Sequence, residues 1–211
     1  ALYDFNDKIN FIATRHESAA SFMAEAYGKL KGEVGICFVT RGPGATNASI
    51  GVHTAMQNSS PMILFIGQIG RDMTEREAFQ EIDYKAYFGS ISKWVVQVNN
   101  ADRLPEIIGR AFSMALSGRP GPVVVSLPED MLRDLTSAVA INKIQKNCAQ
   151  ISVIQVNLIK GELEKSKKPL IICGGGGWSD IGRNYLKRFA EGVNIPVICG
   201  FRNQDLMDTN S

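Results

Sequence analysis

Thr40-Arg41-Gly42-Pro43-Gly44-Ala45-Thr46-Asn47 is the stretch that decides how this chain is expected to fold. It follows an apolar run at 34–39 that predicts a buried strand, and it leads into an apolar segment at 45–56 that predicts a helix. A Gly-Pro-Gly turn between a strand and a helix exposes backbone N–H groups, which the polar edge of a ligand can approach closely. The octet therefore indicates a binding site, although a simple reversal of the chain explains the same glycines.

Apolar runs and amphipathic segments alternate on both sides of this octet. Strands are predicted at 9–13, 34–39, 62–67, 93–98 and 122–127, and further helices at 17–30 and 102–117. Such strands, separated by helices, are typical of an α/β fold with a parallel sheet covered by helices on both faces. Ligands of these sheets bind beyond the carboxyl ends of the strands, where Glu17, the 42–47 turn and Gln68 are expected.

The character of the sequence changes after Glu129-Asp130. The following segment is rich in Ser, Asn, Gln and Lys, which predicts a linker. A second α/β unit then begins, with helices predicted at 154–165 and 178–191 and strands at 170–173 and 195–200. We therefore predict a first domain at 1–132, a linker at 133–151 and part of a second domain at 152–211.

Composition excludes several classes of protein. The chain is 45% apolar and 21% charged with a net charge of +2, which is typical of a globular protein and gives no reason to expect nucleic-acid binding. No apolar run approaches the roughly 20 residues that cross a bilayer, and the start does not resemble a signal peptide. A cytoplasmic protein without disulfides is expected from the wide spacing of Cys37, Cys148, Cys173 and Cys199. The two histidines, His16 and His53, have no zinc-binding spacing, so no metal site is expected in this chain.

Five separated motifs keep the order and approximate spacing of a known family. They are Arg15-His16-Glu17, the 40–47 octet, Gly67-Gln68, Phe79-Gln80-Glu81 and the segment 117–123. Together they resemble the N-terminal, pyrimidine-binding domain of thiamine-diphosphate (ThDP) enzymes, closest to the acetolactate synthase group, and the tail from Ile151 is similar to that family's central, Rossmann-like domain. The resemblance implies a fragment that lacks the family's first strand and the domain that holds Mg²⁺ and the diphosphate. We expect such a fragment to be inactive alone.

The resemblance assigns catalytic roles to Glu17 and Gln80. In this family a carboxyl group at N1′ of the aminopyrimidine favours the 4′-imino tautomer, which takes the proton from C2, and that role falls on Glu17. We expect an apolar pocket to raise the pKa of this carboxyl group. An ordinary Glu in the first turn of a helix explains the same residue. Gln80 is implied to donate a hydrogen bond to the substrate.

Other residues are implied to contact the cofactor or the substrate. Pro43, Gly44 and Asn47 would line the pyrimidine slot, although Asn47 could also cap the helix. Phe79 would reach toward the reacting centre with Gln80, unless 71–81 is simply a solvated loop.

Two departures from the family pattern concern charge. Arg41 stands where the family carries a small residue, and it pairs either with an acidic substrate group or with a neighbouring Glu; a surface ion pair is equally compatible. Glu129 replaces a Lys that assists substrate binding, which argues against acetolactate synthesis itself.

A glycine run at 174–177 does not fit the dinucleotide fingerprint, because Ser179 takes the place of the third glycine. The resemblance implies that Gly174, Gly175 and Arg119 contact FAD. The interpretation that we favour is a simple turn, with Arg119 holding the edge of the domain.

The predicted function is that of a fragment of a ThDP-dependent lyase or carboligase that acts on 2-keto acids. The resemblance further implies a homodimer or tetramer, Mg²⁺ held by the absent domain, and optional FAD. Two alternatives are a non-catalytic module that keeps the fold and an NAD-binding dehydrogenase, which depends on the glycine run alone. Retention of Glu17 together with Gln80 favours the enzyme.

Overall fold

A computed structural model describes residues 2–5, 7–147 and 149–208, and the chain divides into two compact units, 1–145 and 146–211. The boundary between the two units, at 145/146, falls inside the linker predicted at 133–151. The bounds of the two predicted domains stay predictions. Cys37, Cys173 and Cys199 are free thiols, and Cys148 lies outside the described residues. No helix in the described ranges is long and apolar enough to cross a bilayer.

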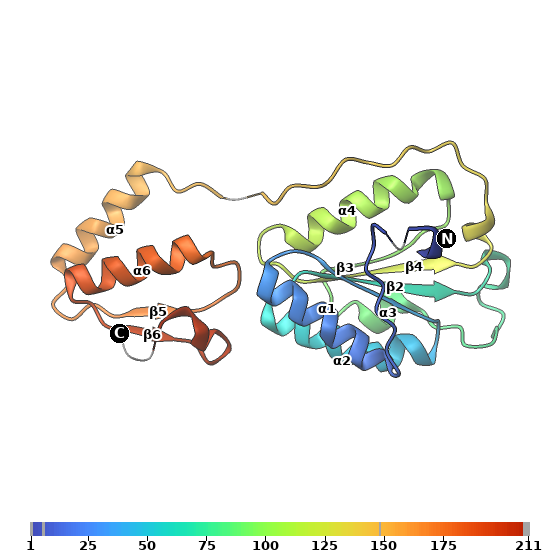
Figure 1. Ribbon diagram of the computed structural model, residues 1–211, viewed down its shortest axis with the longest axis horizontal. Coiled ribbons are helices and arrows are strands. Elements are labelled where there is room, and N and C mark those ends of the chain that lie inside the picture. Colours follow the sequence, from blue (N-terminus) through green and yellow to red (C-terminus); the bar gives the residue numbers. More distant parts are fainter. Residues whose placement is uncertain (1, 6, 148, 209–211) are drawn as a thin grey trace. The chain divides into compact units, whose positions relative to one another are not determined.

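The first unit is built on a parallel sheet of four strands in the order β1-β2-β4-β3 (Figure 1). The strands are β1 (Gly35–Val39), β2 (Met62–Gln68), β3 (Trp94–Gln97) and β4 (Pro122–Pro128). Leu64 in β2 lies between Cys37 of β1 and Val124 of β4. The two central strands are almost wholly buried because helices cover both faces of the sheet.

The helices form a layer on each face of the sheet. One layer contains α1 (Glu17–Lys31), α2 (Pro43–Asn58) and the short α3 (Tyr84–Phe88), and the other contains α4 (Leu104–Leu116) (Figure 1). Leu64 and Ile66 point into the core under α1 and α2, whereas Ile63 and Phe65 point into the core under α4. This alternation follows the period of two of a strand. The predicted α/β fold, with a parallel sheet covered on both faces, is confirmed, and these elements lie within two residues of their predicted bounds, except α3, which was not predicted.

Glycines let α1 and α2 approach each other and the sheet closely. A Cβ atom at Gly51 of α2 would lie 2.3 Å from Ser21 Oγ of α1. A Cβ atom at Gly35 of β1 would lie 1.9 Å from the carbonyl oxygen of Ala24. The close crossing of the two helices brings their N-terminal ends to the same edge of the sheet.

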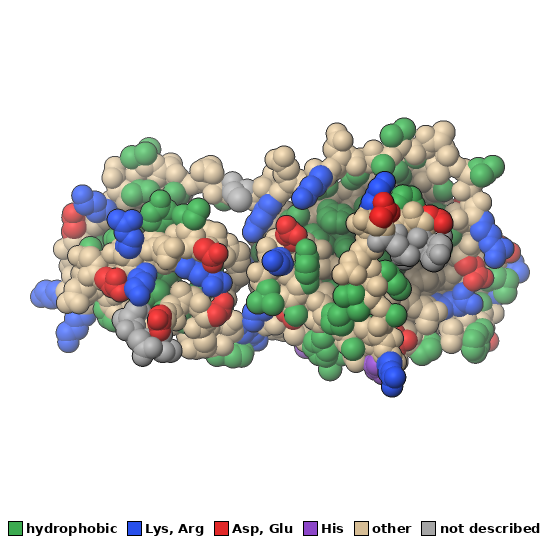
Figure 2. Space-filling model, viewed as in Figure 1, with side chains coloured by type: hydrophobic (Ala, Val, Ile, Leu, Met, Phe, Trp, Pro, Cys, Tyr) green, Lys and Arg blue, Asp and Glu red, His purple; other side chains and the backbone are tan. Residues whose placement is uncertain are grey.

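The predicted strand at 9–13 is wrong. These residues have no regular secondary structure, and β1 pairs with β2 alone among the described strands. An apolar run becomes a strand only where a neighbouring strand accepts its hydrogen bonds. The segment instead borders a groove of about 870 Å³ between itself, α1 and β1, and Glu17 lies in the lining of that groove. Apolar side chains gather at this surface, where Phe11 and Ile12 are each 58% exposed (Figure 2).

The second unit contains a parallel pair of strands and two helices. They are α5 (Val153–Lys165), β5 (Ile171–Cys173), α6 (Asp180–Val193) and β6 (Val197–Cys199), all within two residues of the predicted bounds. Short 3-10 helices complete the two units: η1 Leu2–Phe5, η2 Arg71–Met73, η3 Ala101–Arg103, η4 Met131–Arg133 and η5 Phe201–Leu206.

Candidate functional site

Glu17 is the first residue of α1, and its side chain is tied to α2. His16 caps the helix, because its Nδ1 accepts a hydrogen bond from the backbone N–H of Ser18 at 3.2 Å. The Glu17 carboxylate is half-buried, and its Oε2 accepts a hydrogen bond from Asn47 Nδ2 at 3.0 Å. The two residues that the sequence separates by 30 positions therefore meet at one edge of the sheet.

The pKa of Glu17 is lowered, and the prediction of a raised pKa is wrong for this arrangement. The hydrogen bond from its own backbone N–H is the largest cause, and the hydrogen bond from Asn47 is the second. Partial burial acts in the opposite direction and is outweighed. Glu17 is therefore an ionised hydrogen-bond acceptor at neutral pH.

The turn at Gly42 and Gly44 needs glycine for two different reasons. Gly42 has a left-handed φ of 61°, and a Cβ atom there would lie 2.7 Å from Gln80 Cβ. Its N–H donates to the hydroxyl oxygen of Tyr84 at 2.8 Å. A Cβ atom at Gly44 would lie 2.7 Å from Thr40 Cγ2 and 3.6 Å from Glu17 Oε1. The turn thus places the N-terminus of α2, with Pro43 in its first turn, beside the Glu17 carboxylate.

The loop at 69–82 is held at its base and in its interior. The buried side chain of Gln68 donates from Nε2 to the Ile82 carbonyl oxygen at 3.0 Å, and its Oε1 accepts from the N–H of Ile69 at 3.0 Å. The Glu81 carboxylate accepts from the N–H groups of Glu75, at 2.8 Å, and Ala78, at 3.2 Å. These bonds restrain a loop that its charge-rich sequence would otherwise leave solvated.

Phe79 and Gln80 lie in this loop with different environments. Phe79 is 79% exposed. Gln80 is half-buried with a left-handed φ of 68°, and it packs against Gly42. A non-glycine residue in this conformation is held by its surroundings.

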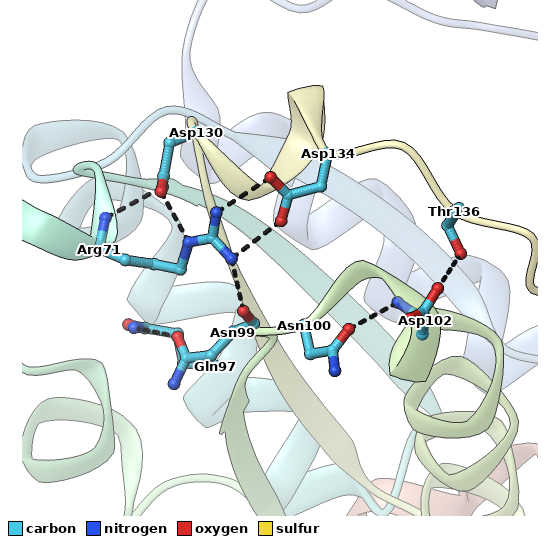
Figure 3. Close-up of polar contacts among 8 residues, drawn as sticks. All are labelled: Arg71, Gln97, Asn99, Asn100, Asp102, Asp130, Asp134 and Thr136. Atoms are coloured by element: carbon cyan, nitrogen blue, oxygen red, sulfur yellow. Dashed lines mark hydrogen bonds and ion pairs between the residues drawn. The ribbon is translucent and has the colours of Figure 1, made fainter.

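Arg71 joins the segments that follow three neighbouring strands (Figure 3). Its Nε donates to Asp130 Oδ2 at 2.6 Å, and its backbone N–H donates to Asp130 Oδ1 at 2.9 Å. The guanidinium also pairs with Asp134 at 2.9 Å and donates to the Asn99 carbonyl oxygen at 2.8 Å. One side chain therefore fixes the segments after β2, β3 and β4 relative to one another.

This cluster gives a pH dependence with a defined sign. The side-chain hydrogen bond from Arg71 lowers the pKa of Asp130 from its ordinary 3.8. A carboxyl group with a lowered folded-state pKa stabilises the fold above the unfolded pKa, and that stabilisation is lost as the pH falls through the folded pKa. We expect the free energy of unfolding to fall more steeply between about pH 5 and pH 2 in the native protein than in Asp130→Asn. Urea unfolding at a series of pH values measures the two slopes, and equal slopes would contradict the assignment. Asp7→Asn, at an exposed position outside the cluster, is the control.

Arg41 forms an ion pair with Glu129. Its Nη1 donates to Glu129 Oε2 at 2.8 Å, and the Arg41 and Glu129 side chains are 26% and 60% exposed. The sequence left open whether Arg41 pairs with an acidic group of a substrate or with a neighbouring Glu. In the structure Arg41 pairs with a neighbouring Glu, Glu129. The two residues that depart in charge from the family pattern are therefore partners of each other.

Comparison with known proteins agrees with this architecture. Residues 1–87 match the family described as thiamine pyrophosphate enzyme, N-terminal TPP binding domain, where thiamine pyrophosphate is another name for ThDP. The resemblance inferred from the five motifs is confirmed.

The whole chain is similar to acetolactate synthase subunits. It is 35% identical over 203 residues to the acetolactate synthase isozyme 3 large subunit of Escherichia coli, covering 90% of this chain and 34% of that protein. The acetolactate synthase large subunit of Lactococcus lactis is 36% identical over 204 residues, with 94% and 35% covered. The mitochondrial acetolactate synthase catalytic subunit of Saccharomyces cerevisiae is 35% identical over 208 residues, with 91% and 30% covered. The chain thus spans about a third of the length of these relatives.

The edge of the first unit at Glu17 has groups that can face an aminopyrimidine ring. The ring presents N1′ and a 4′-amino group on an otherwise flat surface. The Glu17 carboxylate supplies an acceptor, and the side chain that Gly44 lacks leaves the approach to Oε1 open. Among the described residues no cluster of three or more His, Cys, Asp or Glu side chains could hold a metal ion.

Arg119 and the glycine run have structural partners. Arg119 Nε donates to Ser59 Oγ at 2.8 Å, and its Nη2 donates to the Met56 carbonyl oxygen at 2.9 Å. The guanidinium thus satisfies carbonyl groups at the C-terminus of α2. In the second unit, Gly174 and Gly175 follow β5, and Gly175 has a left-handed φ of 74°. These contacts favour the structural interpretation of Arg119, and contacts of the three residues with FAD stay a prediction.

Sequence reasoning assigned no role to Tyr84 and Arg71, and it placed Gln68 at a strand end without identifying its partners. Tyr84 accepts from Gly42, Gln68 closes the loop, and Arg71 joins the ends of three strands. Gln68 carries the one available signal, a polar residue at the end of an otherwise apolar run, since a buried amide requires partners.

Proposed function

We propose that this chain supplies the pyrimidine-binding part of a ThDP site in an enzyme that cleaves or forms carbon–carbon bonds next to the carbonyl group of a 2-keto acid. One observation carries the proposal: the Glu17 carboxylate, held by Asn47, lies beside the glycine turn of a domain whose family binds thiamine pyrophosphate. The similarity to acetolactate synthase subunits supports the choice of substrate class.

ThDP, when bound, supplies the carbon nucleophile that adds to the keto group of the substrate. Glu17 would face N1′ and share a proton with it: its lowered pKa favours the ionised carboxylate, so the proton would lie on N1′ and the carboxylate would accept the resulting N1′–H hydrogen bond. Asn47 orients the carboxylate, and Pro43 and Gly44 line the ring. Gln80 donates from its amide to the substrate, and Phe79 covers the substrate from the same loop.

Further cofactors and an oligomeric state belong to the same proposal. Mg²⁺ binds the diphosphate through residues outside this chain, and FAD is an optional second cofactor at Arg119, Gly174 and Gly175. The enzyme acts as a homodimer or tetramer in the cytoplasm. These features follow from the resemblance to the ThDP family.

Ligand protection of the complete protein tests the proposal against both alternatives. ThDP with Mg²⁺ at 100 times its Kd is expected to stabilise the fold by about 2.7 kcal/mol, which raises the Tm by several degrees. NAD at the same concentration is expected to leave the Tm unchanged. Protection by NAD without protection by ThDP would favour a dehydrogenase. Protection by ThDP in a protein that consumes none of a panel of 2-keto acids would favour a non-catalytic module.

A further inference from the structure

Arg41 carries more hydrogen-bond donors than the protein uses. A guanidinium has five N–H donors, and one of those on Arg41 is given to Glu129. Its Nε is buried, and no acceptor for it exists among the residues that the structure describes. The Arg41 side chain keeps 26% of its surface exposed.

The ion pair lies at the edge of the sheet that carries the proposed site. Arg41 follows β1 and Glu129 follows β4, and β2 lies between these strands. The Glu129 N–H donates to the Gln68 carbonyl oxygen at 3.0 Å, which fixes the backbone of Glu129 beside the end of β2. Arg41 also adjoins Gly42, against which Gln80 packs. Arg41 and Gln80 therefore both adjoin the Gly42 turn.

Glu129 and Arg41 differ in how much of each side chain is exposed to solvent. Glu129 is 60% exposed and Arg41 is 26% exposed. An ion pair with this exposure contributes little to stability, because water and salt screen it. Turning the Glu129 side chain into solvent therefore costs little, whereas the Arg41 guanidinium stays where the strand end places it. A second carboxylate can take over the position of the Glu129 carboxylate on Arg41.

We propose that Arg41 binds the carboxylate of the substrate and that Glu129 is its displaceable counter-ion, which competes with the acid and limits its affinity. This inference rests on the proposed function and names the group that holds the charged end of the 2-keto acid. It places the cation at 41 and the competing anion at 129. The exchange makes and breaks hydrogen bonds and ion pairs only.

Direct binding of oxamate, a carboxylate that has the shape of pyruvate and does not react, tests the exchange. The Kd is measured by calorimetry on the complete protein with ThDP and Mg²⁺, for native protein, Glu129→Gln, Arg41→Gln and the double variant. We expect Glu129→Gln to bind oxamate about tenfold more tightly and Arg41→Gln about tenfold more weakly, the size of one charge-assisted hydrogen bond. The double variant is expected to match Arg41→Gln, because Glu129 has nothing to compete for once Arg41 is gone.

Arg103→Gln and Glu106→Gln provide a matched control. These residues form an exposed ion pair at 2.7 Å at the N-terminal end of α4, so each replacement changes the net charge as its counterpart does. Neither is expected to alter the Kd for oxamate. A shift of the same size in the control would mean that net charge, and not the Arg41 site, determines the affinity, and would overturn the proposal.

If Glu129→Gln binds oxamate with an unchanged or higher Kd, the proposal is also overturned. This comparison tests the proposal even if Arg41→Gln fails to fold. Failure of the proposed function has a different signature. If the protein consumes no 2-keto acid but the oxamate pattern holds, Arg41 is a carboxylate site and the proposed reaction is wrong. If 2-keto acids are consumed while oxamate binding is insensitive to both residues, the reaction stands and the exchange is wrong.

Discussion

Replacing Glu17 by Gln is expected to lower the turnover of 2-keto acids by the complete enzyme by about 10²–10⁴-fold, the usual contribution of one positioned acid–base group. The amide still accepts a hydrogen bond from Asn47 through its oxygen, so the contact between α1 and α2 survives. What the variant loses is the negative charge that N1′ requires. We therefore expect an almost unchanged free energy of unfolding alongside the loss of turnover, with kcat measured by steady-state consumption of pyruvate.

Glu106→Gln is the control for this comparison. Glu106 also lies in the first turn of a helix of the same unit, and a hydrogen bond from Arg103 lowers its pKa. It is exposed on α4, away from the Glu17–Asn47 contact. A similar loss of turnover in both variants would mean that a carboxylate at a helix N-terminus matters for stability and not for the reaction.

Replacing Gly51 by Ala is expected to destabilise the first unit by about 1–3 kcal/mol, the usual cost of overpacking a core. The added Cβ would lie 2.3 Å from Ser21 Oγ and 2.8 Å from the Ser21 carbonyl carbon, so α1 and α2 must move apart. Because Glu17 and Asn47 lie on these two helices, we also expect a higher Kd for ThDP. Urea unfolding followed by circular dichroism gives the change in stability.

Gly109→Ala is the control, at a second buried glycine in a helix. Here we expect the gain in helix stability to outweigh the clash of the added Cβ. A Cβ atom there would lie 2.4 Å from Cδ1 of Ile141, the flexible end of a side chain that is 44% exposed, and in ordinary contact with Cδ1 of Ile144. The clash is relieved by a rotation, while the helix gains about 0.5–1 kcal/mol from the loss of a glycine. Equal destabilisation by the two substitutions would contradict the account of the α1–α2 crossing.

Local pattern was sufficient for most of the fold. The apolar runs that became β1, β2 and β4 are nearly continuous, and the helix at 17–30 shows a regular apolar spacing. The run at 9–13 is also mostly apolar, yet it forms no ladder with the edge strand β1, because a groove lies between them. Strand formation depends on a partner that the local sequence does not specify.

The site was predictable only where topology brings residues together. Asn47 lies near the start of α2, which follows β1, and Glu17 begins α1, which packs against α2, so the two side chains meet where the N-terminal ends of these helices lie together. The pairing of Arg41 with Glu129 spans 88 positions, and no local pattern encodes it. The lowered pKa of Glu17 also escaped prediction, because it depends on the hydrogen bonds that the carboxylate accepts and not on its burial alone.

Exchange of the C2 proton of bound ThDP with deuterium tests the central claim most directly, since it reports the proton transfer without any substrate. The complete protein is expected to accelerate this exchange strongly over free ThDP, and Glu17→Gln, saturated with ThDP and Mg²⁺, is expected to lose about 10²–10⁴-fold of that rate. An exchange rate in Glu17→Gln equal to that of the native protein would contradict the role of Glu17.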